Sequence, residues 1–307
     1  MDRIDAAILR TVIYADIFNF PLTVEEIHHF LIGDEPASIE AVRQSLSASD
    51  WLRHRIATNG VYYALSGRDD LFSVRDEHEA ASRRLWPQAV QHGAWLSRLP
   101  FVRMVAVTGA LAMRNASDQD DDLDYLLITA AGRVWLARAF AVLLVRLARL
   151  RGVEICPNYV LAETALQQDK RDLFMAHEMA QMVPLFGRGL YWQMREANTW
   201  VNEHLANASR PYFQEPELNI GRGWAVVKRL LEALLGGRAG DALEAWEYRR
   251  KMRRFAHDLQ TPHSSAQLDE NHVKGHFNDH GHPVLRRFQE QLEQHGLVET
   301  PMLAPGD

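Results

Sequence analysis

The fold of this 307-residue chain is decided by residues 105–129, which read VAVTGALAMRNASDQDDDLDYLLIT. The apolar, β-branched run at 102–107 predicts a buried strand. That run ends at Thr108 and Gly109, and a helix-compatible stretch and an acidic loop follow. A second apolar strand then begins at Leu123. The pattern therefore predicts a strand, a glycine turn opening a helix, and a second strand.

The residues after this segment extend the same alternation. A long helical pattern follows Gly132, and residues 153–161 have the composition of a third strand. Strand, helix, strand, helix, strand indicates a small sheet with helices, so residues 101–168 are predicted to form the core domain.

The first 66 residues are typical of a winged-helix-like module, with three helices followed by a hairpin. Thr23 and Glu26 form a capping-box pattern, and Asn59-Gly60 is a hairpin-turn signal between two short apolar runs. Residues 67–100 are predicted to form a helical linker, which Pro87 should kink or restart.

Residues 169–307 are mostly helical in pattern, so the predicted fold class is α+β, with a small mixed sheet flanked by the winged-helix-like module and a C-terminal helical domain. Two features of this region have no assigned role. His272, His276 and His280 have a metal-compatible spacing if helical, although Gly275 and a Gly-His-Pro turn oppose one continuous helix. The basic run at 249–254 is interpreted by default as a solvated helix face paired with Glu244 and Glu247.

Asp122 and Asp124 are the residues that indicate chemistry. Two positions apart on a strand, their side chains share one face and can hold hard divalent cations through oxygen. Gly109 lets a phosphate approach the backbone closely, at the start of a helix whose N–H groups can receive it.

With the Thr-Gly turn before it and the apolar strand after it, this segment resembles the signature of the DNA polymerase β-like nucleotidyltransferase superfamily. The resemblance implies that the chain transfers a nucleoside monophosphate from an NTP, most simply ATP, to an acceptor and releases pyrophosphate. It implies Mg²⁺ or Mn²⁺ as cofactor, with Asp122 and Asp124 as catalytic metal ligands. The chain is accordingly expected to be an enzyme.

The remaining site residues follow from that resemblance. The family supplies a third acidic residue from the next strand, where Glu154 is the acidic candidate and Asn158, a weaker neutral ligand, is the alternative. The expected nucleotide-binding residues are Thr108, Gly109, Ala110, Arg114 and Asn158. Ala110 departs from the family pattern because it has no hydroxyl for phosphate, a role left to Thr108. Arg114 is equally well interpreted as a solvated helix residue.

Composition limits the partners. An apolar fraction of 47%, a single cysteine and no visible secretory signal predict a cytoplasmic globular protein. The apolar stretch at 134–150 contains three arginines and is too short for a bilayer span, so it is predicted to be a buried amphipathic helix and no membrane partner is expected. Residues 1–66 carry five basic against nine acidic residues, so duplex DNA is not an expected partner.

The acceptor stays open between a small molecule, a protein and a tRNA end, and a homodimer is left open as well. Two other functions are weighed. A catalytically degenerate fold that senses nucleotides or binds proteins is favoured if the third site is neutral. A winged-helix regulator would need a basic recognition face, which the sequence lacks. Glu178 is interpreted as a surface carboxylate, with a role as base for the acceptor hydroxyl as the alternative.

Overall fold

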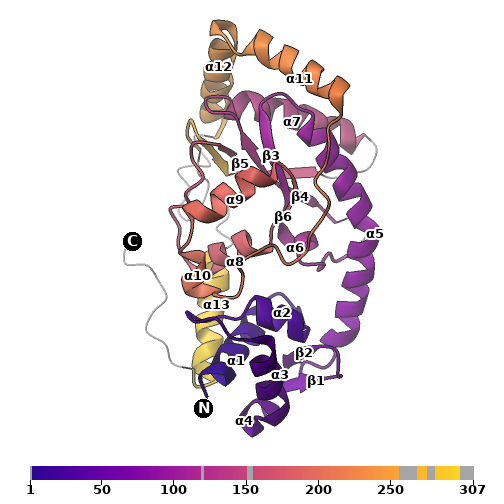
Figure 1. Ribbon diagram of the computed structural model, residues 1–307, viewed down its shortest axis with the longest axis vertical. Coiled ribbons are helices and arrows are strands. Elements are labelled where there is room, and N and C mark those ends of the chain that lie inside the picture. Colours follow the sequence, from indigo (N-terminus) through magenta and orange to yellow (C-terminus); the bar gives the residue numbers. More distant parts are fainter. Residues whose placement is uncertain (1, 119–120, 151–154, 256–267, 275–280, 298–307) are drawn as a thin grey trace.

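The computed structural model is a mixed α+β molecule with one five-stranded sheet near its middle (Figure 1). It describes residues 2–118, 121–150, 155–255, 268–274 and 281–297. The predicted fold class, α+β with a small mixed sheet, is confirmed at this level. The strand order is β6-β3-β4-β5-β7, so the three strands predicted from sequence occupy the centre.

The sheet is mixed in direction. The strands are β3 Val102–Val107, β4 Leu123–Thr129, β5 Ile155–Ala162, β6 Val183–Phe186 and β7 His272–Lys274. β3 pairs antiparallel with β4 and β6, β4 pairs parallel with β5, and β5 pairs antiparallel with β7. The parallel pair needs a crossover, which α7 (Val134–Arg149) supplies.

The N-terminal module lies at the end of the molecule opposite α11 and α12 (Figure 1). Its elements are α1 Arg3–Asp16, α2 Val24–His29, α3 Ile39–Ala48, α4 Asp50–Arg53 and the hairpin β1 Ile56–Thr58 with β2 Tyr63–Leu65. The capping box predicted at α2 is present, because the Glu26 carboxylate accepts from Thr23 N at 2.8 Å. The module therefore consists of four helices followed by a two-stranded hairpin, where three helices were expected.

A single long helix, α5 Leu71–Ser97, runs from the hairpin alongside the sheet (Figure 1). The helix is continuous through Pro87, so it does not restart there. Arg75, near the start of α5, connects this helix to the N-terminal module through hydrogen bonds. It donates to the Glu26 carboxylate at 2.9 Å and to the carbonyls of Pro21 and Arg114, both at 3.3 Å.

The other helices flank or extend the sheet: α6 Gly109–Ala112, α8 Leu173–Gln181, α9 Arg188–Ala197, α10 Val201–His204, α11 Arg222–Leu235, α12 Arg238–Phe255 and α13 Gly281–Gln294. Alternate residues of β3 and β4 face opposite sides of the sheet. Met104 and Leu126 belong to a core shared with α8, α13 and the N-terminal module, whereas Val105 and Leu127 belong to a core with α5 and α7.

Two expectations need correction. The region predicted to be helical contributes β6 and β7, which form the two edges of the sheet. The helix after Gly109 is a single turn. The amphipathic helix expected over residues 134–150 is present as α7, which buries Trp135 and Ala141 and leaves Leu143 and Leu147 56 and 54% exposed. Across the described ranges, no helix has both the length and the apolar content to cross a bilayer.

Candidate functional site

The start of β4 brings Asp124 against the turn that follows β3. Thr108 N donates to the Asp124 carbonyl oxygen at 3.0 Å, which holds the two segments together. Gly109 has φ +67°, in the left-handed region that favours glycine. A Cβ at Gly109 would overlap Asp124 Oδ2 and lie 3.1 Å from its Cγ. The glycine is therefore required both by its backbone conformation and by the adjacent carboxylate.

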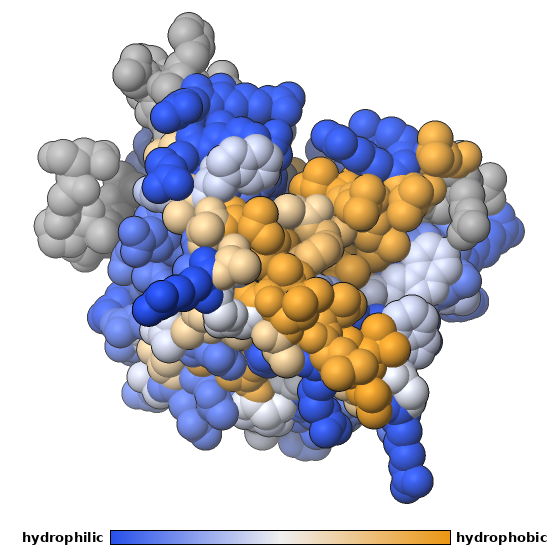
Figure 2. Space-filling model, turned by 90° about the horizontal axis from the view of Figure 1, so that it is seen from above, coloured by the Kyte–Doolittle hydropathy of each residue, from blue (hydrophilic) through white to orange (hydrophobic). Residues whose placement is uncertain are grey.

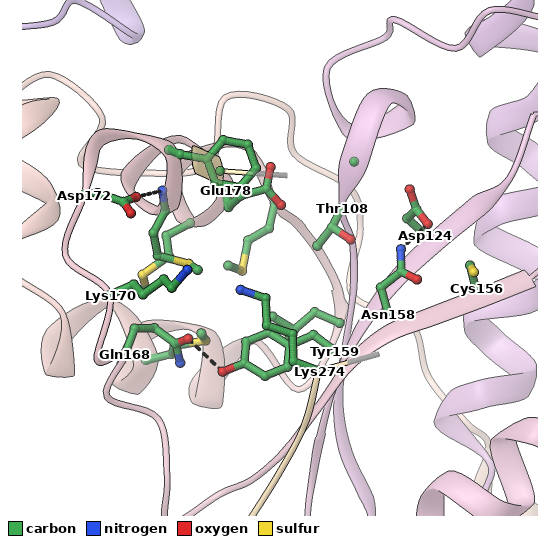
Figure 3. Close-up of a pocket in the computed structure, with 18 of the residues that line it drawn as sticks. Thr108, Asp124, Cys156, Asn158, Tyr159, Gln168, Lys170, Asp172, Glu178 and Lys274 are labelled. Carbon is green, nitrogen blue, oxygen red and sulfur yellow. Dashed lines mark hydrogen bonds between the residues drawn. The ribbon is translucent and has the colours of Figure 1, made fainter. Parts of the chain in front are cut away.

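The neighbouring strand β5 adds polar groups to the same edge. The register between β4 and β5 shifts after Tyr125↔Pro157, so that Asn158 is the extra residue before Leu126↔Tyr159. Such a bulge redirects side chains. The Asn158 amide donates to Asp124 Oδ1, and Cys156, paired with Asp124 in register, lies beside it (Figure 3).

These residues form one side of a cavity of about 360 Å³, a size typical of ligand sites. The opposite side comes from the segment before α8, from α8 itself and from β7. Figure 3 shows Thr108, Asp124 and Asn158 on the sheet side and Lys170, Asp172 and Glu178 across from them. Four methionines supply an adaptable apolar surface: Met175, Met179, Met182 and Met194.

The cavity contains two carboxyl groups with unusual acidity. Burial raises the pKa of Asp124 to about 7, and the hydrogen bond from Asn158 only partly offsets it. Burial likewise raises the pKa of Glu178 to about 7, although Lys274 lowers it. The negative charge of Glu178 also raises the pKa of Asp124, so the two carboxyl groups interact electrostatically. Each carboxylate would be stabilised by a bound cation.

Asp122 and Asp124 are the side chains at this edge that could hold Mg²⁺ if other ligands joined them. Both line the same cavity, Asp124 from β4 and Asp122 from the position before that strand. Magnesium is commonly bound by one or two carboxylates, with substrate phosphates and water completing its shell. Among the described residues, no group of three or more His, Cys, Asp or Glu side chains could hold a metal ion.

A second cavity, of about 270 Å³, adjoins the first. Gly109, Phe174 and Glu178 line both. Its other walls come from the N-terminal module, the turn after β3, α8 and α13, and they include Tyr14, Phe18, Phe20, Phe30 and His177. Glu178 therefore stands between a polar cavity and an aromatic one.

The structure brings together most of the predicted site residues. Thr108, Gly109, Asp122, Asp124 and Asn158 line the first cavity. Ala110 lines only the second. Arg114 lines neither, because its guanidinium lies over the rings of Trp86 and Phe213, at 3.9 and 4.9 Å from their centroids. Glu154 lies outside the described residues.

The histidine cluster and the basic run singled out in the sequence are found at other places in the structure. His272 belongs to β7, with Nδ1 3.0 Å from Asp269 Oδ2, and His276 and His280 lie outside the described residues. In the basic run, Arg250 pairs with Glu247 at 2.6 Å as expected. Glu244 instead accepts hydrogen bonds from Trp135 N and Leu136 N, so it caps the start of α7.

Two lysines of the cavity were not predicted. Lys170 precedes α8, and Lys274 is on β7, with its Nζ 5.9 Å from the centroid of the Tyr159 ring. Figure 3 shows Lys170 across the cavity from Asp124, and Lys274 beside Tyr159 between them. The sequence around these two lysines contains no phosphate-binding motif. Only the pairing of β7 with β5 places Lys274 at the site.

No family model, curated protein or solved structure matches the chain.

Proposed function

We propose that this chain is a nucleotidyltransferase that transfers a nucleoside monophosphate from Mg²⁺-bound NTP, with ATP the first candidate, to a hydroxyl acceptor. The observation that carries the proposal is the contact between Gly109 and the Asp124 carboxylate, with Asp122 lining the same cavity. A turn that needs glycine, placed against a carboxylate pair, is the arrangement that the polymerase β-like resemblance implies. The strands that carry it are the antiparallel β3 and β4 and the parallel β5.

Each group has a task in this proposal. Asp122 and Asp124 would hold Mg²⁺ together with the phosphates, and the metal would supply charge neutralisation for the leaving oxygens. The turn at Thr108 and Gly109 lines the cavity, so its backbone would contact the phosphates. Lys170 and Lys274 provide the positive charge that a triphosphate requires on the far side of the cavity.

The proposal assigns Glu178 as the base that accepts the proton of the acceptor, because this residue lines both cavities. The acceptor oxygen forms its bond to the α-phosphorus while the bond from that phosphorus to the bridging oxygen breaks. Pyrophosphate leaves with the electrons of the broken bond, and the hydroxyl proton goes to the Glu178 carboxylate. A pKa of about 7 suits a base at neutral pH, because a useful fraction is ionised and protonation remains favourable.

One observation favours the second candidate, a degenerate fold that binds nucleotides without transfer. On the described part of β5, Asn158 contacts Asp124 and no carboxylate does. The two candidates differ in turnover. Calorimetric titration with each NTP, with and without Mg²⁺, tests binding, and pyrophosphate release in a metabolite extract tests transfer. Mg²⁺-dependent binding with pyrophosphate release supports the enzyme, binding without release supports the sensor, and absence of binding contradicts both.

A further inference from the structure

The first inference concerns the second cavity and rests on the proposed function. We propose that this cavity holds the acceptor, and that the acceptor is an uncharged molecule with a planar apolar group ending in a hydroxyl. The cavity adjoins the nucleotide cavity through Gly109, Phe174 and Glu178, so a hydroxyl at the junction would meet both the base and the α-phosphate.

The lining indicates the planar group. His177 stacks on Tyr14 with ring centroids 3.9 Å apart and lies 6.1 Å from Phe30. Its Nδ1 is 3.0 Å from the carbonyl oxygen of Leu173, so the ring is fixed with Nδ1–H donating. Fixed aromatic walls favour flat apolar ligands by stacking and edge contacts.

The charges of the lining exclude other acceptors from this cavity. Among the described residues that line it there is no arginine or lysine, so a sugar phosphate or a tRNA end would find no cation. A polycationic sugar would meet only one carboxylate, Glu178. Because Tyr14, Phe18 and Phe30 belong to the N-terminal module, that module forms part of a substrate site in this proposal.

The test uses 2-naphthol as the probe, titrated calorimetrically into the full chain without metal or nucleotide. Saturable binding is expected, and Phe18→Ala should weaken it about tenfold by removing apolar contact. Phe18 is 40% exposed, so the variant should fold, and Trp192→Ala, at 39% exposed and outside both cavities, is the matched control.

Failure to bind 2-naphthol, or equal affinity in Phe18→Ala and Trp192→Ala, overturns the inference. Asp124→Asn separates it from the proposed function, because that variant should keep 2-naphthol binding and lose Mg²⁺-dependent ATP binding. Loss of 2-naphthol binding alone defeats the acceptor site, whereas absence of Mg²⁺-dependent ATP binding in the native chain defeats the proposed function.

A separate observation concerns the opposite end of the molecule. Of the fourteen large apolar side chains that are exposed among the described residues, eleven lie on α7 with its C-cap, α11 and α12. We call them the α7/α11/α12 face: Leu143, Leu147, Leu150, Trp224, Val226, Val227, Leu230, Leu231, Leu234, Leu243 and Trp246. Figure 2 looks onto this end and shows a broad apolar patch bordered by hydrophilic side chains.

The same three helices are strongly basic. They carry twelve Arg and Lys residues against four Asp and Glu, a balance of +8 in a chain whose net charge is −6. The exposed Arg146, Arg229 and Arg249 are among them. Exposed apolar helix faces with tryptophan, flanked by arginine, are the pattern of helices that lie in a membrane interface.

We infer that the α7/α11/α12 face docks on an anionic lipid surface. Its charge complements such a surface, since each basic residue near it contributes about 1 kcal/mol. A symmetric contact between two copies would bring the basic residues of these helices together and is disfavoured. The sequence prediction of no membrane partner rested on a segment that is too short and too charged to span a bilayer, and docking on a lipid surface requires no span.

Vesicle co-sedimentation tests this inference with phosphatidylcholine alone and with phosphatidylcholine mixed with phosphatidylglycerol. The native chain should bind only the mixed vesicles, and less at high salt. The double variant Leu230→Glu with Leu234→Glu, at positions 65 and 74% exposed, should bind at least about tenfold more weakly. Val61→Glu, at a 58% exposed position beside the β1–β2 hairpin, is the control.

Equal binding to both kinds of vesicle, no binding to either, or no effect of the double variant overturns the inference. Light scattering after size-exclusion chromatography measures the oligomeric state of the native chain and of the double variant. A native dimer that the double variant converts to monomers, without lipid binding, would assign the face to a second copy of the chain instead.

Discussion

Gly109 and Asp124 are in direct contact across the β3–β4 connection: the glycine has φ +67°, and its missing Cβ leaves the space that Asp124 Oδ2 fills. Because of this contact, the end of β3, the turn at Gly109 and the Asp124 carboxylate hold one another in position. It also links the local backbone to the proposed metal ligand.

Replacing Gly109 with alanine should therefore disturb the site as well as the backbone. Gly132 is the matched control, because it has φ +66° and a Cβ added there would meet no heavy atom within 4 Å. Both variants should lose about 1–2 kcal/mol of unfolding free energy from left-handed strain. Only Gly109→Ala should also weaken Mg²⁺-dependent ATP binding, and equal binding in the two variants would contradict the role given to this contact.

The buried carboxyl of Glu178 predicts a pH-dependent stability difference. Its folded pKa of about 7 exceeds the unfolded value of 4.5, so the stability supplied by the protonated form is lost as the pH rises through 7. Glu178→Gln should raise the unfolding free energy by about 1–2 kcal/mol at pH 8, allowing for partial exposure. The gain should disappear as the pH falls from 7 to 4.5.

Denaturant unfolding in EDTA across this pH range measures the effect. Glu196→Gln, at an exposed position on α9, is the control and should show no such gain. A Glu178→Gln gain that does not depend on pH would show that its carboxyl is not a buried titrating group.

The ion pair between Arg75 and Glu26 should dominate the attachment of the N-terminal module. Both side chains are almost fully buried, at 3 and 2% exposed, and their atoms are 2.9 Å apart. Arg75→Met should cost about 3–5 kcal/mol, because it leaves Glu26 buried without its cation. Adding Glu26→Gln should recover part of the loss in urea unfolding, and a double variant no more stable than Arg75→Met would contradict this.

The same module should not bind duplex DNA. Arg43 pairs with Glu25 at 2.8 Å, and Arg53 pairs with Asp50 at 2.9 Å. The guanidinium of Arg55 lies over Trp51, 4.3 Å from the ring centroid. These arginines are engaged within an acidic module, so the full chain should give no mobility shift with duplex DNA at physiological salt. A shift with steep salt dependence would contradict this, because that slope counts neutralised phosphates.

The sequence predicts the centre of the sheet and one side of the cavity, because those parts are local. The apolar runs of β3 and β4 are long enough to show strand composition, and a two-residue spacing places Asp122 and Asp124 on one face. Gly109 is recognisable because it directly follows a strand. Each of these signals lies within about one turn or strand of the chain, the range over which backbone periodicity operates.

The edges of the sheet could not be predicted. β6 has four residues and contains Pro184, which an edge strand tolerates, and β7 has three residues. Strands this short have no periodicity to detect. Lys274 reaches the cavity only through β7, and Phe18 reaches the second cavity only through packing of the N-terminal module. Exposure of Leu150 likewise depends on what packs beside α7, which no local pattern records.

In the proposed function, Asp124 binds a metal together with a nucleotide. Calorimetric titration of Mg²⁺ and ATP into the native chain and Asp124→Asn tests it, with the exposed Asp69→Asn as control. We expect Mg²⁺-dependent ATP binding that weakens at least about tenfold in Asp124→Asn, because a charged ligand to a hard cation is lost, and that persists in Asp69→Asn. Unchanged Mg²⁺-dependent affinity in Asp124→Asn would contradict it.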